Sequence, residues 1–172
     1  MASASHVFKI IKTLFLPLVN VVNAVPIASI TIIALMAMTA ANLPVFVVFI
    51  TVMPIIYHNT FKGIENTDKK LLEMADLFRI PKWKKIIFIY FKSVAPFVVS
   101  AASSGIGFAW KSGVAAEVIG LVSGSIGSRL HQARIMLQTA DLLAWTLTII
   151  ILSYCMEKLF KLVFKRVLLW QS

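Results

Sequence analysis

The chain has 172 residues, of which 59% are hydrophobic and only 14% are charged, and its formal net charge at pH 7 is +10. No charged residue occurs between Lys12 and Lys62, or between Lys92 and Lys111. Soluble domains do not carry apolar segments of this length, so the composition excludes that class and indicates an integral membrane protein. The basic residues stand at the ends of apolar segments, as topology signals do, and we therefore expect no nucleic-acid binding.

The first segment, His6 to Ala24, combines Lys9 and Lys12 with an apolar face, and Pro17 interrupts it. It lacks the short apolar core and small-residue cleavage site of a signal peptide. We expect an interfacial helix near the cytoplasmic surface that is retained in the protein.

Four apolar stretches follow, each close to the roughly 20 residues that cross a bilayer core. They cover residues 22–41, 44–61, 86–110 and 141–158. Between the last two, residues 113–138 predict a short helix, a turn and another short helix. The sequence therefore predicts one all-α domain, a polytopic membrane helix bundle with about four spans.

The charged loop, residues 62–85, separates the second and third spans. Leu71, Leu72, Ala75 and Phe78 recur at helical spacing, which predicts a short amphipathic helix. Thr67 and Asp68 are placed to cap its start. Pro81 stops it and suits the first turn of a second helix, so we expect a helix–turn–helix that docks a partner outside the membrane.

Orientation follows from the distribution of positive charge. With the loop inside, the cytoplasmic side also holds the N-terminal lysines and a basic C-terminal cluster, Lys158 to Arg166. The outer side keeps only Lys111, Arg129 and Arg134. This bias obeys the positive-inside rule and predicts cytoplasmic termini.

Small residues recur every fourth position in the third span, at Ala101, Gly105, Ala109 and Gly113. Such spacing lets helices approach closely in lipid. One interpretation is a packing contact within one subunit. The other is a face that meets a second copy and lines a transport pathway.

Glu117 continues that face, and Lys111 precedes it. An ionisable group near the membrane is costly, so it faces a cavity or a partner. Either Glu117 forms a structural ion pair near the outer surface, with Lys111, Arg129 or Arg134 as partner, or Lys111 and Glu117 gate or contact a passing solute.

Catalytic and metal-binding patterns are absent from the sequence: it has no HExxH, GxSxG, CxxC or P-loop motif. We expect no cofactor, no metal site and no enzymatic activity, so any energy for transport must come from a partner.

Several motifs resemble one family. Glu73-Met74-Ala75, with Trp83 eight residues after Ala75 and Pro96-Phe97 beyond, looks like the EAA cytoplasmic loop of ABC importer permeases. Residues 107–111, 114–120, 125–127 and 139–145 resemble the nitrate/sulfonate/taurine branch. The similarity runs from about Pro17 to Trp170.

The resemblance implies a transport subunit in the plasma membrane for a small, anionic solute. Its implied partners are cytosolic ATPase subunits, an extracytoplasmic solute-binding protein, a second copy of the chain and membrane lipid. The resemblance also implies that the ATPase docks on the coupling residues of the loop. These are Leu71, Leu72, Glu73, Ala75, Phe78 and Arg79. The alternative for this loop is an amphipathic helix lying on anionic lipid.

The chain departs from the family pattern in three respects. Arg79 stands where relatives usually have glycine, so we expect a different turn there, and Lys92 replaces a frequent proline. Relatives usually have one or two further spans ahead of the first one here. The alternative function is a non-transporting membrane scaffold that recruits a cytosolic protein through the same loop.

Overall fold

A computed structural model describes residues 16–17 and 19–169, and this part of the chain is helical with no β-strand. The predicted all-α class is confirmed for these residues. In chain order the elements are α2 (Ile27–Ala37), α3 (Leu43–Glu65), α4 (Lys69–Leu77), α5 (Lys82–Lys85), the π-helical turn η1 (Ile86–Tyr90), α6 (Phe91–Gly120), α7 (Ile126–Ile135) and α8 (Thr139–Leu169).

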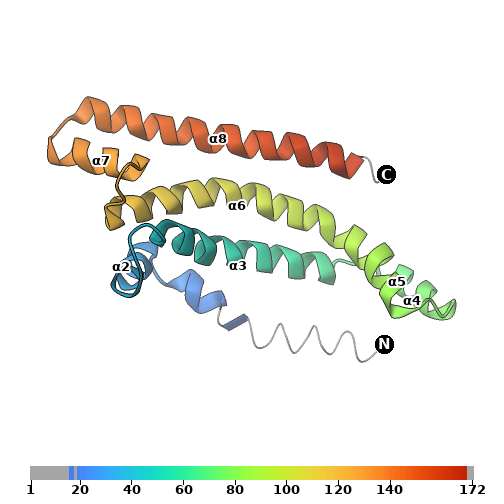
Figure 1. The fold of residues 1–172 in the computed structure, drawn as a ribbon. Coiled ribbons are helices and arrows are strands. Elements are labelled where there is room, and N and C mark those ends of the chain that lie inside the picture. The colour runs from blue at the N-terminus through green and yellow to red at the C-terminus, as the bar shows by residue number, and fades with distance from the viewer. Residues whose placement is uncertain (1–15, 18, 170–172) are drawn as a thin grey trace.

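Helix α6 is the central element of the bundle. It contacts α3 along one side and α8 along another, and both run antiparallel to it (Figure 1). The short helices α2 and α7 pack at the end of the bundle where α6 terminates, while α4 and α5 project from the opposite end. The molecule is therefore an elongated bundle with a helical loop at one end.

Two helical stretches among the described residues are long and apolar enough to cross a bilayer. They are α3 and the continuous stretch Lys82–Gly120, which joins α5, η1 and α6. Only 17% and 11% of their most apolar windows are buried. These helices therefore present apolar side chains outward, as helices in contact with lipid do.

The first predicted span, residues 22–41, differs from the structure because it is not one helix. Helical backbone ends at Ala24, and the chain bends at Val25 and Pro26 before α2 begins. With 11 residues, α2 is about 16 Å long, well short of a hydrocarbon core of about 30 Å. Proline restricts the residue before it to extended backbone, which accounts for the break. The interfacial helix expected at residues 6–24 lies largely outside the described residues.

Glycines bring α3 and α6 together at both ends. A Cβ on Gly63 would lie 3.0 Å from the Cα of Val94, and one on Gly120 would lie 2.6 Å from Leu43 Cδ2. Neither position has room for a larger residue without movement. We call this contact the α3–α6 seam, and close backbone approach of this kind is a main source of helix attraction in lipid.

Helix α6 is longer than the predicted third span. It continues past Trp110 to Gly120 and absorbs the first short helix expected within residues 113–138. It ends where Leu121 adopts a left-handed backbone with φ of 51°. Helix α7 follows, with Ser125 capping its start through a 3.1 Å bond from the Ser128 amide. The predicted fourth span lies within α8.

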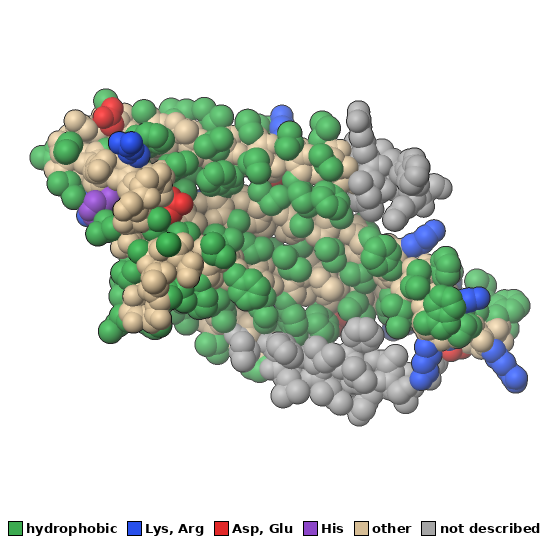
Figure 2. Space-filling view, in the orientation of Figure 1, with side chains coloured by type: hydrophobic (Ala, Val, Ile, Leu, Met, Phe, Trp, Pro, Cys, Tyr) green, Lys and Arg blue, Asp and Glu red, His purple; other side chains and the backbone are tan. Residues whose placement is uncertain are grey.

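The surface divides by chemistry. Figure 2 shows apolar side chains over most of the visible bundle, while most of the visible lysines and arginines gather around the loop at one end. This distribution suits a protein whose middle contacts lipid and whose loop contacts water.

Candidate functional site

The start of α4 is fixed by its own side chains. Asp68 Oδ1 accepts a 2.8 Å hydrogen bond from the Lys70 amide, so the predicted N-cap is confirmed. Thr67 is buried, and its hydroxyl donates to the Gly63 carbonyl at 3.3 Å. The amphipathic helix thus begins at a defined point one short turn beyond the end of α3.

The expectation of a different turn at Arg79 is wrong. Arg79 has φ of 53°, the left-handed conformation that glycine would adopt. The Ile80 amide donates to the Ala75 carbonyl at 2.9 Å, and the Arg79 amide donates to Asp76 at 3.0 Å. These two bonds form a Schellman motif, and they hold an arginine in a conformation that is costly for any residue with a Cβ.

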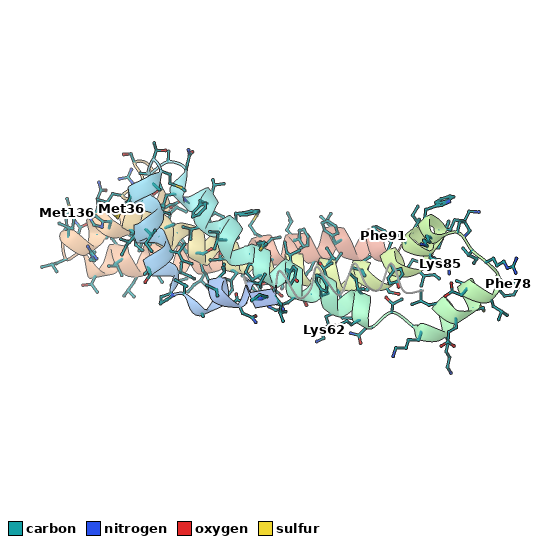
Figure 3. The ribbon with its side chains drawn as sticks, turned by 90° about the horizontal axis from the view of Figure 1, so that it is seen from below. Met36, Lys62, Phe78, Lys85, Phe91 and Met136 are labelled. Carbon is teal, nitrogen blue, oxygen red and sulfur yellow. The ribbon has the colours of Figure 1, made fainter. Side chains whose placement is uncertain are left out.

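An ion pair closes the helix–turn–helix. Lys85 Nζ on α5 contacts Asp76 Oδ1 on α4, and the Lys85 side chain is only 15% exposed. Figure 3 places Phe78 at the tip of the loop and Lys85 on its inner side. Sequence spacing did not predict this pair, which depends on the turn bringing the two helices back together. It links α4 to α5.

The exposed edge of α4 differs in part from the predicted face. Ala75 is buried, at 2% exposure, and Leu72 is half-buried, so Ala75 cannot contact a partner in this arrangement. The ion pair turns that side of the helix inward. Glu73 and Arg79 are exposed. The apolar side chains that do face outward define what we call the docking edge: Leu71, Met74, Leu77 and Phe78.

Two members of the docking edge were missed by the sequence interpretation. Leu77 is 83% exposed and Met74 is 53% exposed. Together with Leu71 they follow a spacing of three residues, which is also a helical periodicity. The sequence interpretation placed Leu72 and Ala75 on the outward face, whereas the structure packs these two residues inward and leaves Met74 and Leu77 exposed.

The small-residue face of α6 lies mainly in the α3–α6 seam. A Cβ on Gly105 would be 3.1 Å from Val52 Cγ1, and one on Gly113 would be 3.2 Å from Val48 Cγ2. Ala101 is buried, at 1% exposure. Next to Gly113, the Thr51 hydroxyl donates a 3.0 Å hydrogen bond to the Ser112 hydroxyl across the same two helices. The structure thus uses Gly105 and Gly113 for packing within one chain.

Ala109 and Gly113 of that face also line an open hollow of about 420 Å³ between α3 and α6. The walls are apolar, formed by residues such as Pro44, Val48 and Trp110, and Glu117 stands at the edge. Glu117 is thus the ionisable residue that lines this hollow, and no basic residue lines it.

Glu117 binds backbone, not a basic side chain. Its Oε2 accepts a 2.9 Å hydrogen bond from the Gly127 amide in the first turn of α7. A Cβ on Gly127 would lie 2.4 Å from Glu117 Cβ, so only glycine permits the contact. The expected ion pair with Lys111, Arg129 or Arg134 does not form among the described residues. Lys111 is exposed.

A second acid in the bundle was not singled out from the sequence. Glu157 on α8 pairs with Lys161 at 2.6 Å, and its Oε2 would lie 3.4 Å from a Cβ on Gly107. Gly107 therefore leaves room for this carboxylate against α6. Within the described residues, no group of three His, Cys, Asp or Glu side chains could hold a metal ion.

Comparisons with known proteins agree on one family. The model of the family described as binding-protein-dependent transport system inner membrane component matches residues 1–169. A protein of Brucella abortus named as a probable ABC transporter permease is 27% identical over 128 residues, which are 74% of this chain and 51% of that protein.

Two further relatives have names that state a solute. A protein of Bacillus subtilis, named provisionally as an aliphatic sulfonates transport permease, is 26% identical over 68% of this chain and 42% of its own length. A bicarbonate transport system permease protein of Synechococcus elongatus is 28% identical over 48% of this chain and 29% of its own length. The chain spans about half the length, or less, of these relatives.

Proposed function

This chain belongs to the family of binding-protein-dependent transport system inner membrane components, and from that membership we propose that it is a permease subunit of an ATP-driven importer. Its solute is a small anion, because relatives carry names of sulfonate and bicarbonate transport. It lies in the plasma membrane as a multi-pass protein with the loop in the cytoplasm. It works as a homodimer with two cytosolic ATPase subunits and an extracytoplasmic binding protein.

The docking edge is the observation that carries this proposal. Leu77 and Phe78 are 83% and 70% exposed on a loop that stands apart from the bundle (Figure 3). Exposed apolar side chains on a polar element mark an interaction surface. A short amphipathic helix of this kind seats in a groove of its partner, with Glu73 at the rim.

Force from the partner has a direct route into the bundle. The Asp76–Lys85 ion pair joins α4 to α5. From Lys82 the helix continues without interruption to Gly120, a stretch of 39 residues, or about 58 Å. A push on the loop therefore moves α6 as a lever and tilts it against α3, which switches the side from which the pathway is open.

At the far end of that lever, Glu117 holds the start of α7 through the Gly127 amide. Movement of α6 is therefore passed to α7 at the outer surface. Exposed Lys111 attracts the anion, and Glu117 acts on the gate by positioning α7. This assignment keeps both residues near the solute path and gives them different tasks.

Substitution of the docking edge tests the proposal. We expect Met74→Gln with Leu77→Gln to lower co-purification of the ATPase subunit from the same source by tenfold or more, because apolar anchor residues dominate such interfaces. Lys69→Gln with Lys70→Gln is the matched control, since both lysines are exposed on α4 outside the edge. It should retain the partner.

Two outcomes would contradict the assignment. Equal retention by both double variants would remove the docking edge from the interface. Retention of the ATPase without ATP-dependent uptake of an anion, in vesicles that also contain the binding protein, would favour the scaffold function.

A further inference from the structure

A hollow of about 360 Å³ lies on the inner side of the loop, between the turn after α4 and η1. Arg79, Lys84 and Lys85 contribute to its walls, and no acidic residue lines it. Phe88 and Ile89 on η1 form one apolar wall, and Phe78, Ile80 and Pro81 of the turn form the other. The hollow thus joins positive charge to a hydrocarbon surface.

Two of the three cations are available to a ligand. Lys85 is paired with Asp76. Arg79 and Lys84 have no carboxylate partner in the part of the chain that the structure describes, and Lys84 Nζ lies 5.5 Å from the Trp83 ring centroid. An anion bound between Arg79 and Lys84 would neutralise charge that the chain itself leaves unpaired.

The hollow lies at the depth of lipid headgroups. The predicted third span begins at Ile86, so the edge of the hydrocarbon lies close to that residue. Phe88 and Ile89 then lie just inside this edge, and Lys84 lies two residues outside it, or about 3 Å. The headgroup layer is about 5–8 Å thick.

The surroundings are those of a membrane interface. Ile86, Ile87 and Phe88 are 50–61% exposed, and Trp83 beside them is 59% exposed. Tryptophan with lysine at the end of an apolar helix is typical of the interfacial layer. A partly exposed apolar turn next to basic side chains suits acyl chains below and phosphate above.

We propose that this hollow binds the headgroup of an anionic phospholipid, with its phosphate held by Arg79 and Lys84 and its glycerol and upper acyl chain lying on Phe88 and Ile89. A basic pocket at the cytoplasmic end of membrane helices is a known form of lipid site. The bound lipid holds the loop at the membrane surface, so force from the docking edge passes into α6. This role rests on the proposed function, whereas binding itself depends only on the loop lying at the membrane surface.

The experiment measures lipid retention by native mass spectrometry on the full chain in detergent, with no ATPase present. The probes are phosphatidylglycerol and phosphatidylcholine with identical acyl chains. We expect phosphatidylglycerol to bind the unaltered chain, and Arg79→Gln with Lys84→Gln to weaken binding by about tenfold or more, since each basic residue near an anionic surface contributes measurably. Phosphatidylcholine should bind at least tenfold more weakly.

The matched control is Lys69→Gln with Lys70→Gln, which removes the same charge from α4 outside the hollow. It should bind phosphatidylglycerol like the unaltered chain. Arg79→Lys with Lys84→Arg keeps both charges and should retain the lipid, which separates loss of the site from loss of the fold. Equal weakening in both neutralised variants would overturn the site.

The same measurement also tests whether the hollow instead binds a free anion or any lipid. Retention of inorganic phosphate at the concentration used for lipid would show a site for free anions and overturn the lipid assignment. Equal binding of both lipids would show a nonspecific apolar contact and also overturn it. Because no ATPase is present, loss of lipid binding would not count against ATPase docking, which is tested separately by the Met74 and Leu77 variants.

Discussion

At the scale of single residues, the left-handed arginine after α4 has a measurable cost. Arg79 has φ of 53°, where its Cβ is crowded, and glycine would relieve this. Glycine also gains chain freedom in the unfolded state, which offsets part of the benefit. We expect Arg79→Gly to stabilise α4 by about 0.5 kcal/mol, seen as two- to threefold slower amide hydrogen exchange over residues 69–77.

Arg79→Ala is the control for this prediction. It removes the guanidinium as glycine does but keeps the Cβ, so exchange over α4 should not slow. Equal protection in the glycine and alanine variants would assign the effect to lost charge and contradict the backbone explanation.

Single residues also show what the sequence could predict. Asp68 as the N-cap depends on neighbours in the chain, and it was predicted correctly. The turn at Arg79, the burial of Ala75 and the bond from Gly127 to Glu117 depend on segments that meet only in the folded chain. Composition and charge therefore predicted the helical class and the loop, whereas the outward side of the loop required the tertiary contacts.

At the scale of elements, the α3–α6 seam decides how much change the bundle accepts. Gly105 faces Val52 Cγ1, which leaves no space for a branched side chain. We expect Gly105→Leu to destabilise the folded chain by about 2 kcal/mol, a typical cost of overpacking, in reversible unfolding by detergent titration. Adding Val52→Ala should recover part of this loss, because it removes the methyl group in the way.

Ser104→Leu provides the control, since Ser104 is the exposed neighbour of Gly105 on the same helix. It should leave stability within about 0.5 kcal/mol of the unaltered chain, as exposed substitutions usually do. If Gly105→Leu instead kept the stability of the monomer and only dissociated a dimer, this face would be an interface between two copies.

The break between residues 24 and 27 illustrates the limit of span prediction. Hydropathy alone counts apolar residues, and residues 22–41 contain enough of them. It does not register that Pro26 ends the preceding helix, nor that the buried cluster of Ala34, Leu43, Val47 and Ala116 ties α2 to α3 and α6. An apolar segment can therefore fold back against the bundle without crossing the membrane as one helix.

At the scale of the whole molecule, both proposals require that the loop and the α7 end lie on opposite sides of the membrane. Figure 3 shows Phe78 and Met136 at opposite ends of the bundle. The loop carries most of the positive charge between the apolar spans, so it faces the cytoplasm. The continuous helix from Lys82 to Gly120 then runs from the cytoplasmic to the outer surface.

Labelling with a membrane-impermeant thiol reagent tests this orientation. In a Cys155→Ser background we expect Phe78→Cys to react only in inverted vesicles and Leu137→Cys only in right-side-out vesicles. Both side chains are well exposed, at 70% and 87%, so lack of reaction in one orientation reports sidedness, not burial. Reaction of Phe78→Cys from the outer side would contradict both the ATPase-docking and lipid proposals, because neither a cytosolic ATPase nor the cytoplasmic leaflet could reach the loop.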